Sequence, residues 1–267
     1  MKNKENIYVV GFPKSGNTWL ARLIAEVTNS TIDVKDESDV INNVDNKEQR
    51  KGKYKIHKLH DSTNSEKILE SNKVVYIVRD VRDVLISGFF FNNPQFNEEQ
   101  VKNNWFIKKY FNYEIKKLNN IWQGNLFTNI LVSINILISK IKGADYPYGY
   151  VGSWSEHINI WSNHSNTIAV KYEDMLIDTH KELQRIAEFL NLDIDDDTLR
   201  KAIANQSFKN KKKKFLEEGD DINAKFMRSG KSGKWKDFLD DEVIRLIESK
   251  HKSMMNKYEY LKIKRKN

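Results

Sequence analysis

Three short apolar runs stand out in the pattern of hydrophobic and polar positions, and a helical pattern follows each of them. They cover residues 7–10, 74–78 and 167–171. Short runs rich in β-branched residues are typical of buried strands, and strands that alternate with helices form parallel sheets. The pattern therefore predicts an α/β fold in which helices flank a parallel sheet.

Amphipathic helices are predicted beside these runs. Apolar residues recur at helical spacing over residues 18–27, 84–89, 183–190 and 243–247. Residues 92–150 are instead rich in asparagine and aromatic residues and show no strand pattern, which predicts a helical insertion. Its aromatic side chains are expected to serve mainly packing. No Pro-, Gly- or Ser-rich linker divides the chain, so we expect residues 1–267 to form a single domain.

Composition narrows the function without deciding it. The absence of cysteine excludes disulfides, thiolate catalysis and cysteine-bound zinc. No group of histidine and acidic residues has the spacing of metal ligands, so we expect no metal. Lysine and arginine total 45 against 37 acidic residues, and the net charge of +8 favours anionic ligands. No nucleic-acid-binding module accompanies this charge, so nucleic acid is not the expected partner.

Targeting and membrane segments are not predicted. Residues 1–6 are polar and the apolar run after them has four residues, which is too short for a signal peptide. Polar residues interrupt the most apolar stretch, 126–138, which is shorter than the ~20 residues that span a bilayer. We therefore expect a cytoplasmic protein.

A glycine-bounded loop follows the first predicted strand. Residues 11–19 read GFPKSGNTW, and both glycines and Thr18 have the spacing of a nucleoside-triphosphate loop. In that loop a lysine after the second glycine contacts the β- and γ-phosphates, but Asn17 stands there, and the only lysine is Lys14. The glycines still permit a close backbone approach, and the next helix directs its positive end at an anion. The loop thus predicts a nucleotide with fewer phosphates.

This loop resembles the 5′-phosphosulfate loop of the sulfotransferase family, which usually reads PKSGTTW where this chain reads PKSGNTW. Two other segments carry the resemblance. KVVYIVRDVRDVLIS at 73–87 is similar to the family's second signature, and FMRSGKSGKWK at 226–236 is similar to its RKGxxGDWK element. The resemblance extends from residue 7 to about residue 236 outside the insertion. It implies the P-loop nucleoside-triphosphate-hydrolase-like sulfotransferase fold.

The resemblance implies a donor, 3′-phosphoadenosine 5′-phosphosulfate, and its product, 3′,5′-bisphosphoadenosine. The first loop would hold the 5′ end, Arg79, Ser87 and Arg228 would bind the 3′-phosphate, and Trp19, Tyr172 and Phe208 would lie around the adenine. The implied nucleotide-binding residues are Lys14, Ser15, Gly16, Asn17, Thr18, Trp19, Arg79, Ser87, Tyr172, Gln206, Ser207, Phe208, Arg228, Ser229 and Gly230. Chemistry agrees with this, because basic and hydroxyl groups at two strand-to-helix junctions predict a ligand with two separated anions.

Three positions depart from the family pattern. Asn17 replaces a common threonine, which changes one side-chain donor. Ser229 stands where lysine is common, which removes a charge that Lys231 is placed to supply. Gln206 stands where threonine is frequent. None of these changes removes either anion-binding cluster.

Sulfuryl transfer to a hydroxyl or amine of a small-molecule or glycan acceptor is the reaction that the resemblance implies. Positioning of the reactants and electrostatic stabilisation of the transition state provide most of the rate enhancement of such a transfer. Lys14 would stabilise the leaving phosphate. The family often takes its general base from a Lys-Thr-His segment about two dozen residues before the 3′-phosphate arginine. Here Lys55-Ile56-His57 precedes Arg79 by 22 residues. We expect His57 to be the base and Lys55 its helper, with His60 and Asp61 as alternatives.

Other functions remain open at this level. A nucleotide kinase or triphosphatase is disfavoured by the missing lysine after Gly16, and a non-enzymatic nucleotide-binding protein would need the same loops without a base. Five lysines within residues 209–214 predict a solvated loop, with attraction of an anionic acceptor as the alternative. No motif identifies the acceptor or the oligomeric state.

Overall fold

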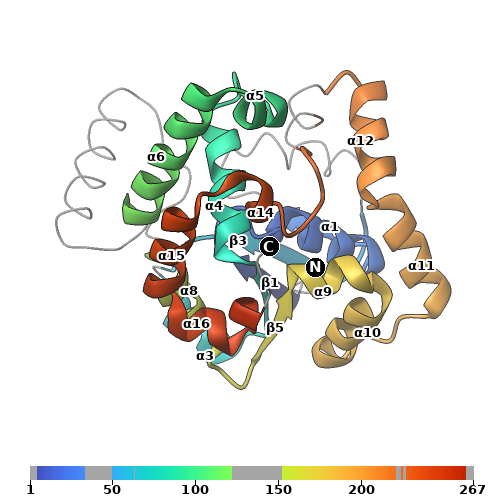
Figure 1. Ribbon diagram of the computed structural model, residues 1–267. Helices are drawn as coiled ribbons and strands as arrows, with labels where there is room; N and C mark the ends of the chain where they lie inside the picture. Colours follow the sequence, from blue (N-terminus) through green and yellow to red (C-terminus); the bar gives the residue numbers. More distant parts are fainter. Residues whose placement is uncertain are drawn as a thin grey trace, which may run out of the picture.

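A five-stranded parallel sheet lies at the centre of the computed structural model (Figure 1). The structure describes residues 5–33, 50–62, 64–121, 152–220, 224 and 227–262. The strands are β1 (Glu5–Gly11), β2 (Thr31–Asp33), β3 (Tyr54–Leu59), β4 (Val74–Val78) and β5 (Thr167–Lys171). Their order is β2-β3-β1-β4-β5, and all neighbouring strands are parallel. The predicted α/β class is confirmed.

Strands β2 and β3 lie outside the three predicted runs, which correspond to β1, β4 and β5. β2 has three residues, and in β3 two lysines and a histidine interrupt the apolar positions. Their pairing is set by the neighbouring strand, with Ile56 opposite Ile7 of β1 and Ile32 of β2. Strand formation here depends on tertiary pairing more than on local composition.

Helices cover both faces of this sheet. Those before the insertion are α1 (Asn17–Val27), α3 (Ser65–Ser71) and α4 (Val81–Asn92), and those at its start are α5 (Glu98–Asn103) and α6 (Trp105–Ile121). Next come α8 (Trp154–Ser162), α9 (Tyr172–Ile177), α10 (Thr179–Leu190), α11 (Asp196–Asn205) and α12 (Phe208–Glu217). The last are α14 (Trp235–Phe238), α15 (Asp241–Lys250), α16 (Lys252–Lys257) and the 3₁₀ turn η1 (Tyr260–Lys262).

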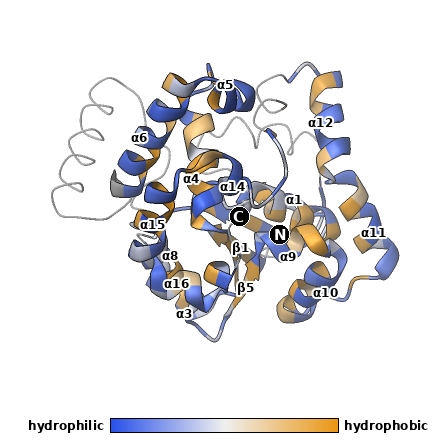
Figure 2. Ribbon diagram, viewed as in Figure 1, coloured by the Kyte–Doolittle hydropathy of each residue, from blue (hydrophilic) through white to orange (hydrophobic). Residues whose placement is uncertain are grey.

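Each face of the sheet has its own hydrophobic core, because side chains alternate between the two faces along a strand. In β4, Tyr76 packs into one core and Ile77 into the other. The first core is closed by α4, α6, α8, α14 and α15, and the second by α1, α9, α10 and α11 (Figures 1 and 2). All of β4 is buried, as expected for an inner parallel strand.

The predicted insertion begins as two helices, α5 and α6, while its residues 122–150 lie outside the described ones. Phe111 is fully buried against Phe89 and Phe238, which fits the expected packing role. Trp105 and Phe106 are instead 64% and 76% exposed, so packing does not account for all of these aromatics. Among the described residues, none of the helices has the length and apolar character needed to cross a membrane.

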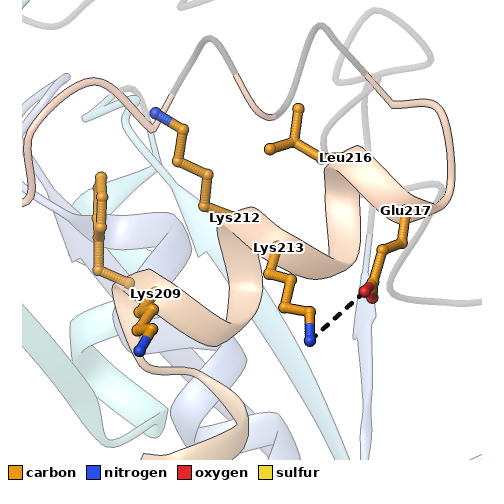
Figure 3. Close-up of a pocket in the computed structure, with 6 residues that line it drawn as sticks. Lys209, Lys212, Lys213, Leu216 and Glu217 are labelled. Carbon is orange, nitrogen blue, oxygen red and sulfur yellow. Dashed lines mark ion pairs between the residues drawn. The ribbon is translucent and has the colours of Figure 1, made fainter.

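The lysine run forms helix α12, so the predicted loop is wrong. Ser207 caps the helix, and Lys213 and Lys214 form ion pairs with Glu217 and Glu218 one turn later. Phe215 is buried on the inner side, where the Arg22 guanidinium lies 5.2 Å from its ring centroid. Figure 3 shows Lys209, Lys212, Lys213 and Leu216 on α12, where they line a shallow hollow. One apolar face and i,i+4 ion pairs stabilise a helix despite the dense positive charge.

Candidate functional site

The candidate site lies at the carboxyl ends of the strands. β1 is the central strand, with β3 on one side and β4 on the other. The loop after β1 therefore lies where the strand order diverges. Ligands of open α/β sheets bind at such a point. His60, Arg79 and Tyr172 directly follow the last residues of β3, β4 and β5 in the sequence, with Arg79 one residue beyond Val78. The parallel sheet therefore gathers these residues around the first loop.

Gly16 ends the first loop as the N-cap of α1. Its φ is 107°, and a Cβ there would lie 2.7 Å from the Tyr172 ring, so both conformation and space require glycine. No side chain caps α1, which leaves its first amides directed at the loop. The Trp19 ring meets Tyr172 edge-on at 5.8 Å. The structure thus brings the loop together with two residues predicted beside the adenine.

Arg79 joins two loops that are far apart in the sequence. Its guanidinium donates to the carbonyl oxygens of Lys14 and Lys231, both at 3.1 Å. Its Cζ lies 4.3 Å from the centroid of the Tyr172 ring. Arg79 is almost fully buried, so its charge is not a solvated surface charge.

Two carboxylates hold the C-terminal loop, residues 227–234, next to Arg79. Asp83 accepts hydrogen bonds from the backbone N–H groups of Gly233 at 2.6 Å and Trp235 at 3.0 Å. Glu98 pairs with Arg228 and, at 2.9 Å, with Lys234. Neither acidic residue was predicted. The role of these two carboxylates becomes apparent only in the folded structure, where α4, α5 and the C-terminal loop lie together.

Phe208 and Gly230 are in direct contact. A Cβ on Gly230 would lie 2.5 Å from the Phe208 ring, and the φ of this glycine is 58°. A side chain there would displace the ring. The structure therefore brings the predicted adenine residue Phe208 to the same loop as Arg228.

Positive charge converges on Lys14. Burial, together with the charges of Arg79, Lys58 and Arg228, holds the pKa of Lys14 well below its usual value. Burial likewise lowers the pKa of Arg228, and the nearby charge of Arg79 adds to the effect. The Lys14 ammonium also lies 3.9 Å from the centroid of the Phe91 ring. Cations that repel one another in this way form a site that an anion would stabilise.

The predicted base, His57, lies within β3 and not at its end. Its Nε2 atom is 2.8 Å from Asn6 Oδ1, its Nδ1 atom is 2.9 Å from Asp33 Oδ2, and its ring stacks on Tyr8. Lys55 pairs with the same Asp33 carboxylate at 3.1 Å. The structure therefore directs neither residue to the first loop, because both precede the strand end.

His60 is the histidine that the structure brings to the loop. Its Nδ1 atom lies 2.9 Å from the carbonyl oxygen of Gly11. Burial lowers the pKa of His60 to about 3, and the charges of Lys58 and Lys14 contribute to this. Lys58-Leu59-His60 repeats the Lys-x-His spacing of 55–57 three residues later. This second Lys-x-His segment, which ends one residue beyond β3, is the feature of the sequence that could have identified His60.

Buried neutral histidines make stability depend on pH. Burial lowers the pKa of His157 to about 4, below the value of about 6.5 in an unfolded chain. Because the unfolded state then binds more protons, the free energy of unfolding decreases as the pH falls below about 6.5. We expect the titration of His157 to lower the free energy of unfolding by about 2 kcal/mol between about pH 7 and pH 5. His157→Gln should reduce the slope of the free energy of unfolding against pH by about 1.4 kcal/mol per pH unit.

Urea unfolding across this pH range measures that slope. His164→Gln, the same substitution at an exposed histidine, controls for the change of side chain itself. Equal slopes for His157→Gln and the wild-type protein would show that the buried ring does not titrate as described.

The remaining predicted residues have mixed surroundings. Ser87 lies within α4, and Ser207 caps α12. Gln206 is buried and donates to Glu26 at 3.3 Å. Within the described part of the chain, no three His, Cys, Asp or Glu side chains are placed to hold a metal ion.

Comparison with known sequences gives a consistent result. The family model of the sulfotransferase domain matches residues 4–259. The chain is 27% identical to sulfotransferase 2A6 of Mus musculus, over 87% of this chain and 78% of that protein. It is 25% identical to sulfotransferase 1E1 of Bos taurus, over 87% of this chain and 77% of that protein.

Solved structures show the same fold. Mouse sulfotransferase SULT7A1, crystallised in complex with PAP, superposes with a TM-score of 0.60 at 21% identity, over 94% of this chain and 84% of that one. Retinol dehydratase, in complex with androsterone and PAP, superposes with a TM-score of 0.55 at 18% identity, over 94% and 80% of the two chains.

Proposed function

The chain belongs to the sulfotransferase family, and on this basis we propose that it transfers a sulfuryl group from 3′-phosphoadenosine 5′-phosphosulfate to a hydroxyl or amine of its acceptor. One observation carries the proposal. The Arg79 guanidinium links the carbonyl oxygens of Lys14 and Lys231, while the charges of Lys14 and Arg228 act on the same region. Cations from three loops thus act on one region, which suits a ligand with two anionic groups.

The residues present fit such a nucleotide. Among the described residues, the buried atoms Ser15 Oγ and Arg79 Nε have no hydrogen-bond partner. Buried polar groups are normally satisfied, so a ligand with several acceptor oxygens suits them. Gly16 and the uncapped start of α1 suit the 5′ end, and Arg228 suits the 3′-phosphate. Both structural neighbours described above were solved with PAP, which supports the same ligand here.

His60 is the proposed general base. The acceptor oxygen attacks sulfur, the bond from sulfur to the oxygen of the 5′-phosphate breaks, and the acceptor proton passes to His60 Nε2. The low pKa of His60 keeps its imidazole neutral near pH 7, so it has a lone pair to accept that proton. Lys14 stabilises the charge that grows on the leaving phosphate, and Lys58 takes the helper role predicted for Lys55. Asp61 is the alternative base.

The acceptor side contains an aromatic surface. Phe91 is 43% exposed and lies beside the Lys14 ammonium, where it provides an apolar wall for a ring or a sugar face. We propose a small-molecule or glycan acceptor, chosen by the insertion at about residues 92–150 within one domain. The cysteine-free composition supports a reducing compartment such as the cytoplasm. Nothing in the comparisons supports the kinase or triphosphatase alternative.

Calorimetric titration tests the proposal directly. The protein should bind 3′,5′-bisphosphoadenosine more tightly than ATP or 5′-AMP, because only the first ligand places phosphates at both ends of the ribose. Loss of the 3′-phosphate should weaken binding by about tenfold or more, the value of a charge-assisted bidentate contact. Tighter binding of ATP would reject the sulfotransferase assignment.

A matched pair of arginine variants locates the 3′-phosphate site. Arg79→Ala should bind the bisphosphate more weakly and prefer it less over 5′-AMP, because one of the two arginines assigned to the 3′-phosphate is gone while Arg228 remains. Arg185→Ala is the control, since that guanidinium pairs with Glu182 and the carbonyl oxygen of Ala169. An unchanged preference in Arg79→Ala would place the 3′-phosphate elsewhere.

A further inference from the structure

The side chain of Asn17 links two strand ends beside His60. Its Nδ2 atom donates to the carbonyl oxygen of Gly11 at 2.9 Å and to that of Leu59 at 3.0 Å. Gly11 ends β1 and Leu59 ends β3. Asn17 is 2% exposed, so its burial shields these bonds from competition by water. Because an amide nitrogen has two protons, both are used to hold the strand ends together.

This link sets the surroundings of the His60 ring. His60 Nδ1 lies 2.9 Å from the same Gly11 oxygen and 3.2 Å from Asn17 Nδ2. A lone pair on Nδ1 would face the lone pairs of the Gly11 oxygen. A proton on Nδ1 instead donates to that oxygen, and the lone pair of the neutral ring is then on Nε2. The contacts therefore favour the tautomer that a general base at Nε2 needs.

The backbone of His60 is held from the opposite side. His157 Nε2 lies 3.1 Å from the carbonyl oxygen of His60, and Tyr76 Oη lies 2.9 Å from His157 Nδ1. Two residues further along, Ser62 accepts a hydrogen bond from the Trp161 indole at 3.0 Å. Contacts from α8 thus hold the backbone on this side, and Asn17 lies against the His60 ring.

We propose that Asn17 is a positioning residue that fixes the tautomer and orientation of His60; this rests on the proposed function. The usual residue of the family at this position, threonine, has a single hydroxyl proton and so could hold only one of the two carbonyl groups. Asn17, which replaces the usual threonine, can thus link the ends of β1 and β3 through both of its amide protons, next to the base.

Three variants test this role with a readout that needs no substrate. In protein labelled with ¹⁵N-histidine, His60→Gln identifies the His60 signals, and two-bond ¹H–¹⁵N spectra report which ring nitrogen carries the proton. The wild-type protein should show a proton on Nδ1 of His60. Asn17→Ala should give a mixture of tautomers, and Asn17→Thr should lie between the two. The signals of His251, a buried histidine paired with Ser155, are the internal control.

Kinetics then separate positioning from nucleotide binding. In Asn17→Ala we expect kcat to fall by about 10- to 100-fold, as for a misplaced catalytic group, with bisphosphate affinity reduced far less. Wild-type tautomer and kcat in Asn17→Ala would overturn the proposal, as would equal losses of affinity and kcat with the tautomer unchanged. If Asn17→Ala does not fold, Asn17→Thr decides by the same spectra. A protein without sulfuryl transfer would refute the proposed function while the spectra still decide the role of Asn17.

Discussion

His60→Ala lowers kcat by about 10²- to 10⁴-fold, the usual contribution of a general base. The imidazole adjoins Gly11 in the first loop, and the charge of Lys14 acts on it, so its removal leaves the acceptor proton without a nearby base. Bisphosphate affinity should change little, because the base acts on the acceptor. Steady-state kinetics with labelled donor and calorimetry with the bisphosphate measure the two effects separately.

His57→Ala is the matched control, three residues earlier and within β3. Its ring is engaged with Asn6 and Asp33, so its loss should affect stability more than turnover. Wild-type kcat in His60→Ala combined with a large loss in His57→Ala would restore the base predicted from the sequence. Unchanged kcat in both variants would move the role to Asp61.

Lys14→Met lowers kcat by about 10²- to 10³-fold, comparable to removal of one donor that stabilises a developing anion. Charge on the 5′-phosphate grows as the bond from sulfur to oxygen breaks, so the ammonium contributes more in the transition state than in the ground state. The loss in kcat should therefore exceed the loss in bisphosphate affinity.

A pH titration adds a second measurement of Lys14. Because its pKa is lowered in the nucleotide-free protein, anion binding must take up a proton once the pH exceeds that pKa. The affinity of the wild-type protein for the bisphosphate should therefore weaken as the pH rises through this region. The affinity of Lys14→Met should weaken less over the same range. The exposed Lys201 is a suitable control, and Lys201→Met should retain the wild-type dependence. Identical pH dependence in Lys14→Met would show that Lys14 is not the group that titrates.

Local pattern was sufficient for part of the fold. β1, β4 and β5 are continuous or nearly continuous apolar runs, and the helices after them have clear amphipathic spacing. β3 was missed because its lysines and histidine interrupt the apolar positions. The lysine run that forms α12 predicts a loop because of its dense charge, although Lys211 and Phe215, which are buried, lie four residues apart, at helical spacing.

The fold class, the family resemblance and the first loop follow from the chain's local patterns, because each of those signals lies in residues that are adjacent in the sequence. Tertiary structure decided which histidine reaches the loop, since a side chain must follow the end of a parallel strand to do so. It also decided that Asp83 and Glu98 anchor the C-terminal loop. Those contacts join residues up to 152 positions apart, whose proximity depends on strand order and helix packing.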